Sequence, residues 1–443
     1  MQQQNGLRRE LGFIHAFSIV VGCVIGSGVF LKPGVVLGYT GDSTIALLAW
    51  LFGGIITIAS GLTIAELAVK IPKTGGLYTY IEEVYGSTLG FLSGWMQTVI
   101  YGPALIGALG LYFGSLLVHF FSWPESWQTV VGIITVLFLT GMNLLGARFG
   151  GWIQTLTTFG KLIPVFLITV FGLWYGDSQV LNVLFKSSQE FSFSSAVLAT
   201  LFAYDGWILV GSVAGEVKNP AKVLPRAITA GLLLIMAAYM LINIAILHVL
   251  PADQVVSLGE NAAGTASTIL FGDFGGKLLS IGILVSIFGS LNGKILSMPR
   301  VPYAMATRKQ LPFSSVFAYV SKRFGTPVNS IFLITGIGII FMCVLDSNRL
   351  SDIATFSIFT FYIFALVAVF RLRKGSEMKP GEYRVPWYPF IPLVSILGSL
   401  FVVFSTLWEK PMDSLLSILL TLVGLPLFWY QGSKEKKKEV SSN

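Results

Sequence analysis

The sequence predicts an all-α membrane protein with 12 transmembrane helices, of which helices 1 and 6 are discontinuous. Hydrophobic residues make up 54% of the 443 residues and charged residues only 11%, against about 25% charged in a typical soluble domain. Apolar runs of about 20 residues, the length that crosses the core of a bilayer, recur along the whole chain. Two of these runs are interrupted at their centres by glycine and polar residues. This composition leaves no room for a sizeable soluble domain.

The twelve candidate spans follow from the apolar runs. Their predicted ranges are 12–38, 44–69, 88–120, 128–147, 153–175, 193–217, 227–250, 273–307, 328–345, 351–370, 388–408 and 412–431. The third and the eighth are longer than a bilayer requires, which predicts tilted helices. Pro299 and Pro302 predict a kink near the end of the eighth span, because proline interrupts helical hydrogen bonding.

The distribution of lysine and arginine predicts the orientation. With the N-terminus in the cytoplasm, 22 of the 29 Lys and Arg residues fall in predicted cytoplasmic segments and five in segments on the other side. Short cytoplasmic loops of membrane proteins carry such an excess. We therefore expect a multi-pass protein of the cell (plasma) membrane with both termini cytoplasmic, held in this orientation partly by the lysines of residues 434–438.

The interruptions fall in the first and sixth spans. Gly26-Ser27-Gly28 lies in the middle of the first, and Tyr204-Asp205-Gly206-Trp207 lies in the middle of the sixth. Glycine disfavours helix, and in lipid an unwound stretch persists only where protein or a water-filled cavity surrounds it. Two interrupted spans in matching positions of two halves indicate the binding site of a secondary transporter.

The positions of the two breaks also predict internal symmetry. Five spans in each half make the first and sixth spans equivalent, and an odd number of spans starts the second unit on the opposite side of the membrane. Spans 1–5 and 6–10 are therefore predicted to be 5+5 inverted repeats. We expect a first half over residues 1–175, a second half over 176–387, and spans 11 and 12 with a basic cytoplasmic tail over 388–443.

The groups freed at the breaks match the constant part of an α-amino acid. The half-helix after the first break begins near Val29, and its unpaired amides, with the Ser27 hydroxyl, form an anion site suited to a carboxylate. The first half of the sixth span ends near Tyr204, so the carbonyls of Phe202, Ala203 and Asp205 can accept from an ammonium group. For the first break a packing notch between Gly22 and Gly26 is the competing interpretation. For the Asp205 side chain, a cation ligand and a partner of freed backbone amides are equally open.

Two lysines lie inside predicted spans. Lys161, in the fifth span, is too central to reach the membrane surface easily. Its fixed ammonium can occupy the place of a coupling Na⁺ and tether the unwound first span to the eighth. A buried lysine also gives up its proton readily, so proton coupling is the competing role. For Lys294, in the eighth span, a snorkelling side chain and a cavity-facing charge both stay open.

No catalytic constellation accompanies Ser27. The three histidines, His15, His119 and His248, lie near span ends, and no nucleotide-binding motif, paired catalytic carboxylates or metal-spaced ligands occur in the sequence. The two cysteines lie inside predicted spans and indicate neither a disulfide framework nor a metal site. We therefore expect no enzyme activity, no cofactor, no bound metal and no nucleic-acid partner.

Several motifs resemble those of the amino acid–polyamine–organocation (APC) superfamily. They are Ile25-Gly26-Ser27-Gly28-Val29-Phe30, Ile71-Pro72-Lys73-Thr74-Gly75-Gly76, Phe202-Ala203-Tyr204-Asp205-Gly206-Trp207 and Gly289-Ser290-Leu291-Asn292-Gly293. The last resembles the L-type amino acid transporter subfamily, and the chain is most similar to its bacterial alanine–serine–cysteine exchangers. The resemblance implies a LeuT-like fold and Na⁺-independent exchange of neutral L-amino acids. It also implies substrate contacts, several through the backbone, from Val24, Ser27, Gly28, Phe202, Ala203 and Asp205. With Gly26 of the first break, seven residues are predicted to bind substrate. The resemblance matches Lys161 and Tyr239, the predicted gating or coupling residues, to a subfamily lysine and a tyrosine near the site.

Two departures from the family pattern affect these expectations. Animal L-type transporters carry a cysteine between spans 3 and 4 for a disulfide to a glycoprotein subunit, and residues 121–128 contain none, so no disulfide-linked heavy subunit is expected. Asp205 and Lys294 occupy positions where relatives often have a small residue. These two differences affect which substrate side chains the protein is expected to prefer. The predicted function is an antiporter of small neutral L-amino acids such as alanine and serine, working by alternating access. The alternative is a proton-coupled symporter with Lys161 as proton carrier.

Overall fold

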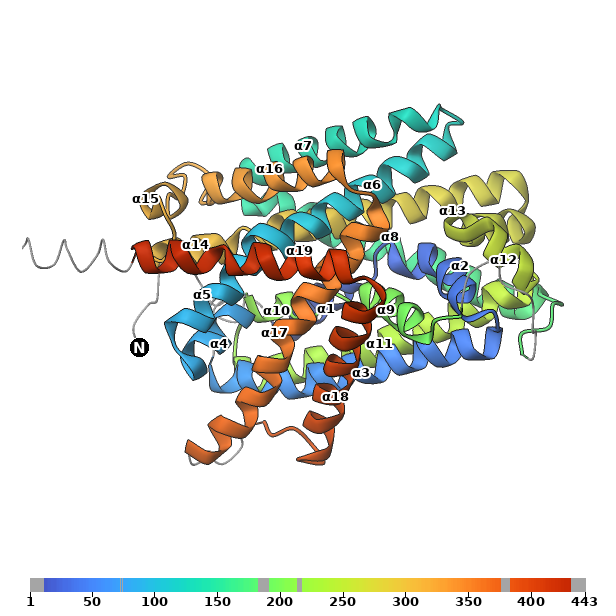
Figure 1. Ribbon diagram of the computed structural model, residues 1–443. Helices are drawn as coiled ribbons and strands as arrows, with labels where there is room; N and C mark the ends of the chain where they lie inside the picture. The colour runs from blue at the N-terminus through green and yellow to red at the C-terminus, as the bar shows by residue number, and fades with distance from the viewer. Residues whose placement is uncertain are drawn as a thin grey trace, which may run out of the picture.

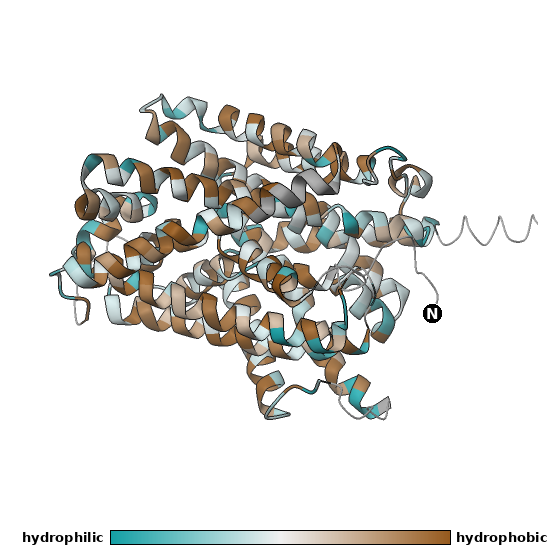
Figure 2. Ribbon diagram, turned by 180° about the vertical axis from the view of Figure 1, so that it is seen from behind, coloured by the Kyte–Doolittle hydropathy of each residue, from teal (hydrophilic) through white to brown (hydrophobic). Residues whose placement is uncertain are grey.

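The computed structural model describes residues 12–71, 73, 75–181, 191–212, 217–375 and 383–431. These residues form a bundle of helices without strands, in which most of the long helices run roughly side by side (Figure 1). Apolar residues dominate the long helices, and polar residues are more frequent where helices end and chain segments connect (Figure 2). The two termini, which the charge distribution predicts to be cytoplasmic, lie outside the described ranges.

Within the described residues, nine helical segments are long and apolar enough to cross a membrane, and a bent pair adds a tenth. The nine are built on α3 (Ser43–Lys70), α5 (Ser87–Met96) with α6 (Gly102–Phe120), α7 (Gln128–Leu144), α8 (Ala147–Tyr175), α11 (Pro220–Val249), α13 (Ala262–Ser297), α17 (Ser347–Gly375), α18 (Phe390–Glu409) and α19 (Pro411–Leu422). Two shorter apolar helices, α9 (Phe193–Ala203) and α16 (Val328–Val344), lie where the sixth and ninth spans are predicted. The multi-pass helical fold is thereby confirmed, and each predicted span coincides with a helix or a helix pair. The division into inverted halves at residues 175 and 387 stays a prediction.

The first span is broken where its glycines predict. Helix α1 (Phe13–Val24) and helix α2 (Gly28–Thr40) meet at an angle of 41°. Residues 25–27 between them are not helical. The amide of Phe30 donates to the carbonyl of Ser27 at 3.0 Å. The amides of α2 before Phe30 have no carbonyl one turn earlier in a continuous helix.

The sixth span is also broken at the predicted place. Helix α9 ends at Ala203, and a short helix, α10 (Leu209–Ser212), follows after a turn over residues 204–208. Gly206 adopts φ 118° in this turn, a conformation that is costly for residues with a Cβ atom. Glycine at this position therefore allows the chain to leave the helix inside the bundle.

The eighth span begins earlier than predicted. Helix α13 begins at Ala262, eleven residues before the expected start, and it passes through Gly272, whose φ of 68° is not helical. At the other end, α13 ends at Ser297 and α14 (Arg300–Thr307) follows, so the interruption lies where Pro299 and Pro302 predict it and the span ends at the predicted residue. The apolar run from residue 273 therefore identified the straight part of the span and missed the helix that precedes Gly272.

A π-helical segment, Gln97–Tyr101, separates α5 from α6 within the third span. Pro103 follows two residues later and lacks the amide hydrogen that would bond the carbonyl of Val99 in a regular α-helix. Such a local widening is typical of functional positions in helices, and it rotates Tyr101 toward the sixth span.

The two broken spans occupy the middle of the bundle. Helix α1 packs on α8, α11 and α13, while α2 packs on α9 and α13, and α9 also contacts α3, α17 and α18. Figure 1 shows α1, α9 and α10 near the centre, between α6 above and α3 below. Unwound backbone is thus enclosed by protein on all these sides, as the cost of unpaired backbone groups in lipid requires.

An ion pair joins the end of α3 to a segment that is distant in the sequence. Glu66, 1% exposed, accepts hydrogen bonds from Arg373 Nε at 2.8 Å and Arg373 Nη2 at 2.6 Å. Its carboxylate also accepts from the backbone amide of Val385 at 2.8 Å. Bidentate geometry with an additional amide donor is the arrangement in which a buried ion pair is best compensated. The pair joins α3 to α17 and to the segment that enters α18.

The remaining short helices connect longer ones. They are α4 (Leu77–Tyr85), α12 (Ala252–Leu258) and α15 (Ser314–Phe317).

Candidate substrate-binding site

A small cavity lies between the two helix breaks. Its volume is about 20 Å³, and Ser290, Lys294, Leu105 and Leu109 contribute to its lining. The seven residues predicted as substrate contacts all line it: Val24, Gly26, Ser27, Gly28, Phe202, Ala203 and Asp205. A space of this size holds about one water molecule, so an amino acid can enter only when the surrounding helices separate.

Lys161 holds the end of α1. Its Nζ donates to the carbonyl of Gly22 at 2.5 Å and to the carbonyl of Ile25 at 2.7 Å, and it lies 3.3 Å from Ser290 Oγ. The break deprives these carbonyls of helical partners and leaves a partial negative charge at the helix end. The ammonium, which is fully buried, therefore satisfies the groups that the break exposes. The contacts join α8 to α1 and α13, the tether expected from the sequence; its role in transport stays a prediction.

The start of α2 lies against the end of α9. A Cβ atom built on Gly28 would lie 2.4 Å from Ala203 Cα, closer than real side chains approach. Glycine is therefore required for the two breaks to meet. The Ser27 hydroxyl is buried beside this contact, and no hydrogen-bond partner for it occurs among the described residues. A buried hydroxyl without a partner costs about 1–3 kcal/mol, so this group is available to a ligand in the cavity.

Tyr239 bridges the two breaks. Its hydroxyl lies 3.1 Å from the carbonyl oxygen of Val24 and 3.0 Å from that of Ala203. These carbonyls belong to the last residues of α1 and α9. The carbonyl of Phe202 accepts from the amide of Asp205 at 3.2 Å. Tyr239 does not line the cavity; it contacts the backbone that does.

Asp205 is paired, and Lys294 is its partner. Lys294 Nζ lies 3.0 Å from Asp205 Oδ2, with side chains 4% and 6% exposed. The Tyr101 hydroxyl lies 2.7 Å from Asp205 Oδ1 and 2.8 Å from Oδ2. The interpretation of Lys294 as a snorkelling side chain is wrong: the lysine turns inward to a carboxylate on the sixth span. The cavity is thus bordered by a charge pair rather than by a single charge.

Breaking this pair is expected to harm the protein more than removing it. Asp205→Asn or Lys294→Met leaves one charge buried without its partner, which costs about 3–5 kcal/mol. The double variant removes both charges, and replacing a whole buried pair is often neutral. Thermal unfolding of the purified protein in detergent should show large losses for each single variant and a smaller loss for the double variant. Additive losses would contradict the pairing.

Sequence reasoning missed three members of this cluster. Tyr101 was not singled out because its direction depends on the π-helical segment, for which Pro103 was the available signal. Ser290 was noted only within a motif, yet its hydroxyl donates to the carbonyl of Ile25 at 3.1 Å. Lys294 was considered without a partner, although an intramembrane aspartate at a helix break was its natural one. Within the described ranges, no group of three or more His, Cys, Asp and Glu residues could hold a metal ion.

The chain is similar to known amino acid transporters along almost its whole length. A family model described as amino acid permease matches residues 11–425. The chain is 54% identical to the serine/threonine exchanger SteT of Bacillus subtilis (strain 168), covering 98% of this chain and 99% of that protein. It is 29% identical to the cystine/glutamate transporter of Homo sapiens, over 97% of this chain and 86% of that protein. It is 30% identical to the large neutral amino acids transporter small subunit 2 of Mus musculus, over 96% and 81% of the two chains.

Proposed function

Because the chain belongs to the amino acid permease family of the APC superfamily, we propose that it exchanges small neutral L-amino acids across the membrane without Na⁺. Each amino acid would bind at mid-membrane between the two breaks, its carboxylate at the start of α2 and its ammonium at the carbonyls that end α9. Transport would proceed by alternating access. The protein is a carrier in this proposal and not an enzyme.

The position of Lys161 is the observation that carries the proposal. Its ammonium donates to two carbonyls at the break of the first span and contacts Ser290 on α13. Carbonyl and hydroxyl oxygens are also the ligands that a sodium ion would use. A covalently attached ammonium at these oxygens supplies the charge without an ion from solution, which supports Na⁺ independence.

The lining of the cavity favours a small polar side chain. Asp205 and Lys294 border the same space as Ser27 and Gly28. A serine hydroxyl can hydrogen-bond to these groups, whereas a large apolar side chain would remove them from water without giving a bond in return. The similarity to the serine/threonine exchanger of Bacillus subtilis supports the same size class. We propose serine and alanine as substrates.

The remaining parts of the proposal concern location. The excess of positive charge in the short loops of one side supports a plasma-membrane protein with cytoplasmic termini. Residues 121–128 offer no cysteine for a disulfide, and the two cysteines of the chain are unpaired, Cys23 buried and Cys343 exposed. We therefore propose that the chain works without a disulfide-linked heavy subunit.

Uptake of radiolabelled serine and alanine into proteoliposomes tests the function. In Na⁺-free buffer at equal pH, vesicles preloaded with unlabelled serine should take up label at least about tenfold faster than empty vesicles. A panel with leucine and glutamate as competitors should show inhibition by small neutral amino acids only. Adding Na⁺ should leave the rate unchanged.

The same assay separates the proton-coupled alternative. Uptake into empty vesicles that rises with an inward proton gradient would replace exchange by symport and would make Lys161 the proton carrier. A stimulation by Na⁺ would contradict the role given to the Lys161 ammonium. Protein-free liposomes, and liposomes with heat-unfolded protein, provide the background rates.

A further inference from the structure

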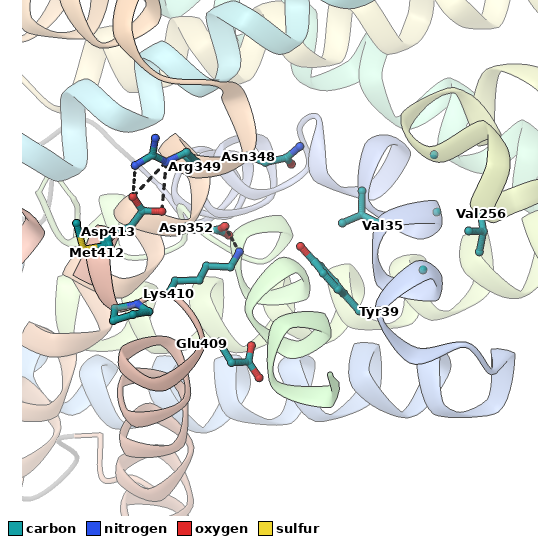
Figure 3. A pocket seen from close by; sticks show the side chains of 14 residues that line it. Val35, Tyr39, Val256, Asn348, Arg349, Asp352, Glu409, Lys410, Met412 and Asp413 are labelled. Carbon is teal, nitrogen blue, oxygen red and sulfur yellow. Dashed lines mark hydrogen bonds and ion pairs between the residues drawn. The ribbon is translucent and has the colours of Figure 1, made fainter. Parts of the chain in front are cut away.

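A second, larger cavity lies toward the C-terminal end of α2. Its volume is about 630 Å³, and it is bordered by α2, the start of α17 and the turn between α18 and α19. Two ion pairs, Lys410–Asp352 and Arg349–Asp413, lie along one side of it, and Tyr39 of α2 lies on the other (Figure 3). The volume is of the order of known small-molecule sites. In the predicted orientation this end of α2 faces the outside of the cell.

One buried lysine lies between this outer cavity and the small cavity at the breaks. Lys32, on α2 and 2% exposed, donates from Nζ to Asn348 Oδ1 at 2.8 Å and contacts the Tyr112 hydroxyl at 2.9 Å. Its ammonium also lies 5.2 Å from the centre of the Phe202 ring, within the range of a cation–π contact. Asn348 lines the outer cavity, and Phe202 lines the inner one.

These four side chains form a single layer across the path between the two cavities. The rings of Tyr112 and Phe202 lie 6.1 Å apart, and Tyr112 also bonds Asn348, with 3.0 Å between their oxygens. They come from four separate helices, α2, α6, α9 and α17. Lys32 contacts each of the other three, so the layer is held together by its ammonium.

Lys32 belongs to α2, the half-helix whose start is proposed to bind the substrate carboxylate. It lies four residues, about one helical turn, after Gly28, the residue that contacts Ala203 across the inner cavity. A displacement of α2 that opens the inner cavity therefore carries Lys32 away from Phe202 and Asn348. Burying an ammonium is costly unless it is bonded, so the intermediate positions are less favourable than the closed layer.

We propose that the outer cavity is the vestibule through which substrate reaches the inner cavity, and that Lys32 is the residue that closes it. The proposal rests on the proposed function in so far as an amino acid takes this route. It makes Lys32 a positioning residue: it sets access to the site without contacting the substrate. Without the Lys32 ammonium, the other three side chains of the layer lose the group that contacts all of them. The inner cavity should then be open to the outside for a larger fraction of the time.

The chain supplies its own reporter for this opening. Cys23 lines the inner cavity and is buried, and Cys343, which is exposed, is the other cysteine of the chain. In a Cys343→Ser background, a membrane-impermeant methanethiosulfonate applied to intact cells can therefore modify the protein only at Cys23. We expect Lys32→Met to speed this modification at least about tenfold, because losing even one of the two hydrogen bonds of its ammonium has an effect of that size. Tyr112→Phe, which removes one hydroxyl, should act in the same direction but less.

Two controls make the outcome specific. Lys277→Met removes an exposed lysine of α13 on the same predicted side and should leave the rate unchanged. If Lys32→Met opens the path, cationic and anionic reagents should both react faster with it. A mere loss of positive charge would instead slow the anionic reagent, so the pair of reagents distinguishes the two effects. Unchanged labelling in folded Lys32→Met and Tyr112→Phe protein, or faster labelling only in inside-out vesicles, would overturn the proposal. Labelling needs no transport, so a failed exchange assay leaves this result interpretable; if Lys32→Met does not fold, Tyr112→Phe decides.

Discussion

Replacing Gly28 by alanine is expected to abolish amino acid exchange. The added Cβ would lie 2.4 Å from Ala203 Cα and 2.5 Å from Ala203 Cβ, so α2 and α9 must move apart. Overpacking of this kind costs about 1–3 kcal/mol, and a cost near 3 kcal/mol lowers affinity more than a hundredfold. Serine uptake into preloaded proteoliposomes and equilibrium serine binding should both fall, because the methyl group occupies the approach to the first amides of α2.

The matched control is another helical glycine. Gly336→Ala adds the same methyl group to α16, where no atom lies within 4 Å of the new position, so exchange and thermal stability should be retained. Gly28→Ala protein that binds serine with unchanged affinity would refute the placement of the carboxylate at this break. Gel filtration and thermal unfolding of both variants show whether the loss arises at the site or from the fold.

Replacing Lys161 by methionine is expected to reduce flux much more than binding. The variant leaves the carbonyls of Gly22 and Ile25 without the ammonium that satisfies them, and each hydrogen bond to a charged group contributes about 1.5–3 kcal/mol. These contacts join α8 to the moving end of α1, whereas the lysine does not line the substrate cavity. We expect the maximal exchange rate to fall about a hundredfold, with serine affinity changed less than about fivefold.

The two quantities must be measured separately. Binding is followed with radiolabelled serine on detergent-solubilised protein, and flux is followed in preloaded proteoliposomes over a range of serine concentrations. Lys277→Met, the exposed lysine of α13, controls for the loss of one positive charge. An unchanged flux at saturating serine would remove Lys161 from the gating mechanism, and a parallel loss of binding would make it part of the substrate site.

Local chemistry made much of this fold predictable. Glycine disfavours helix wherever it occurs. Gly26 and Gly206 therefore allowed the breaks in the first and sixth spans to be placed to within a few residues from the sequence. Helix ends expose backbone groups by geometry alone, and this argument, together with the family resemblance, predicted seven of the residues that line the inner cavity. Proline gave the position of the interruption after α13.

Long-range pairing was the part that sequence could not supply. Asp205 and Lys294 are 89 residues apart, and only the crossing of α13 past the sixth-span break brings them together. Glu66 likewise pairs with Arg373 and with the amide of Val385, more than 300 residues away. A single sequence gives the type and depth of each group and leaves the choice among possible partners to packing.

The bridge made by Tyr239 has a further consequence. The Tyr239 hydroxyl has a single hydrogen to donate, and it lies within hydrogen-bond distance of two carbonyl oxygens, one at the end of α1 and one at the end of α9. Only one of them can receive it fully at any moment. If a substrate ammonium binds the carbonyl of Ala203, as we propose, the hydroxyl hydrogen would turn to the carbonyl of Val24. Tyr239 would then signal from α9 to α1 by a rotation about its C–O bond, with no displacement of its ring.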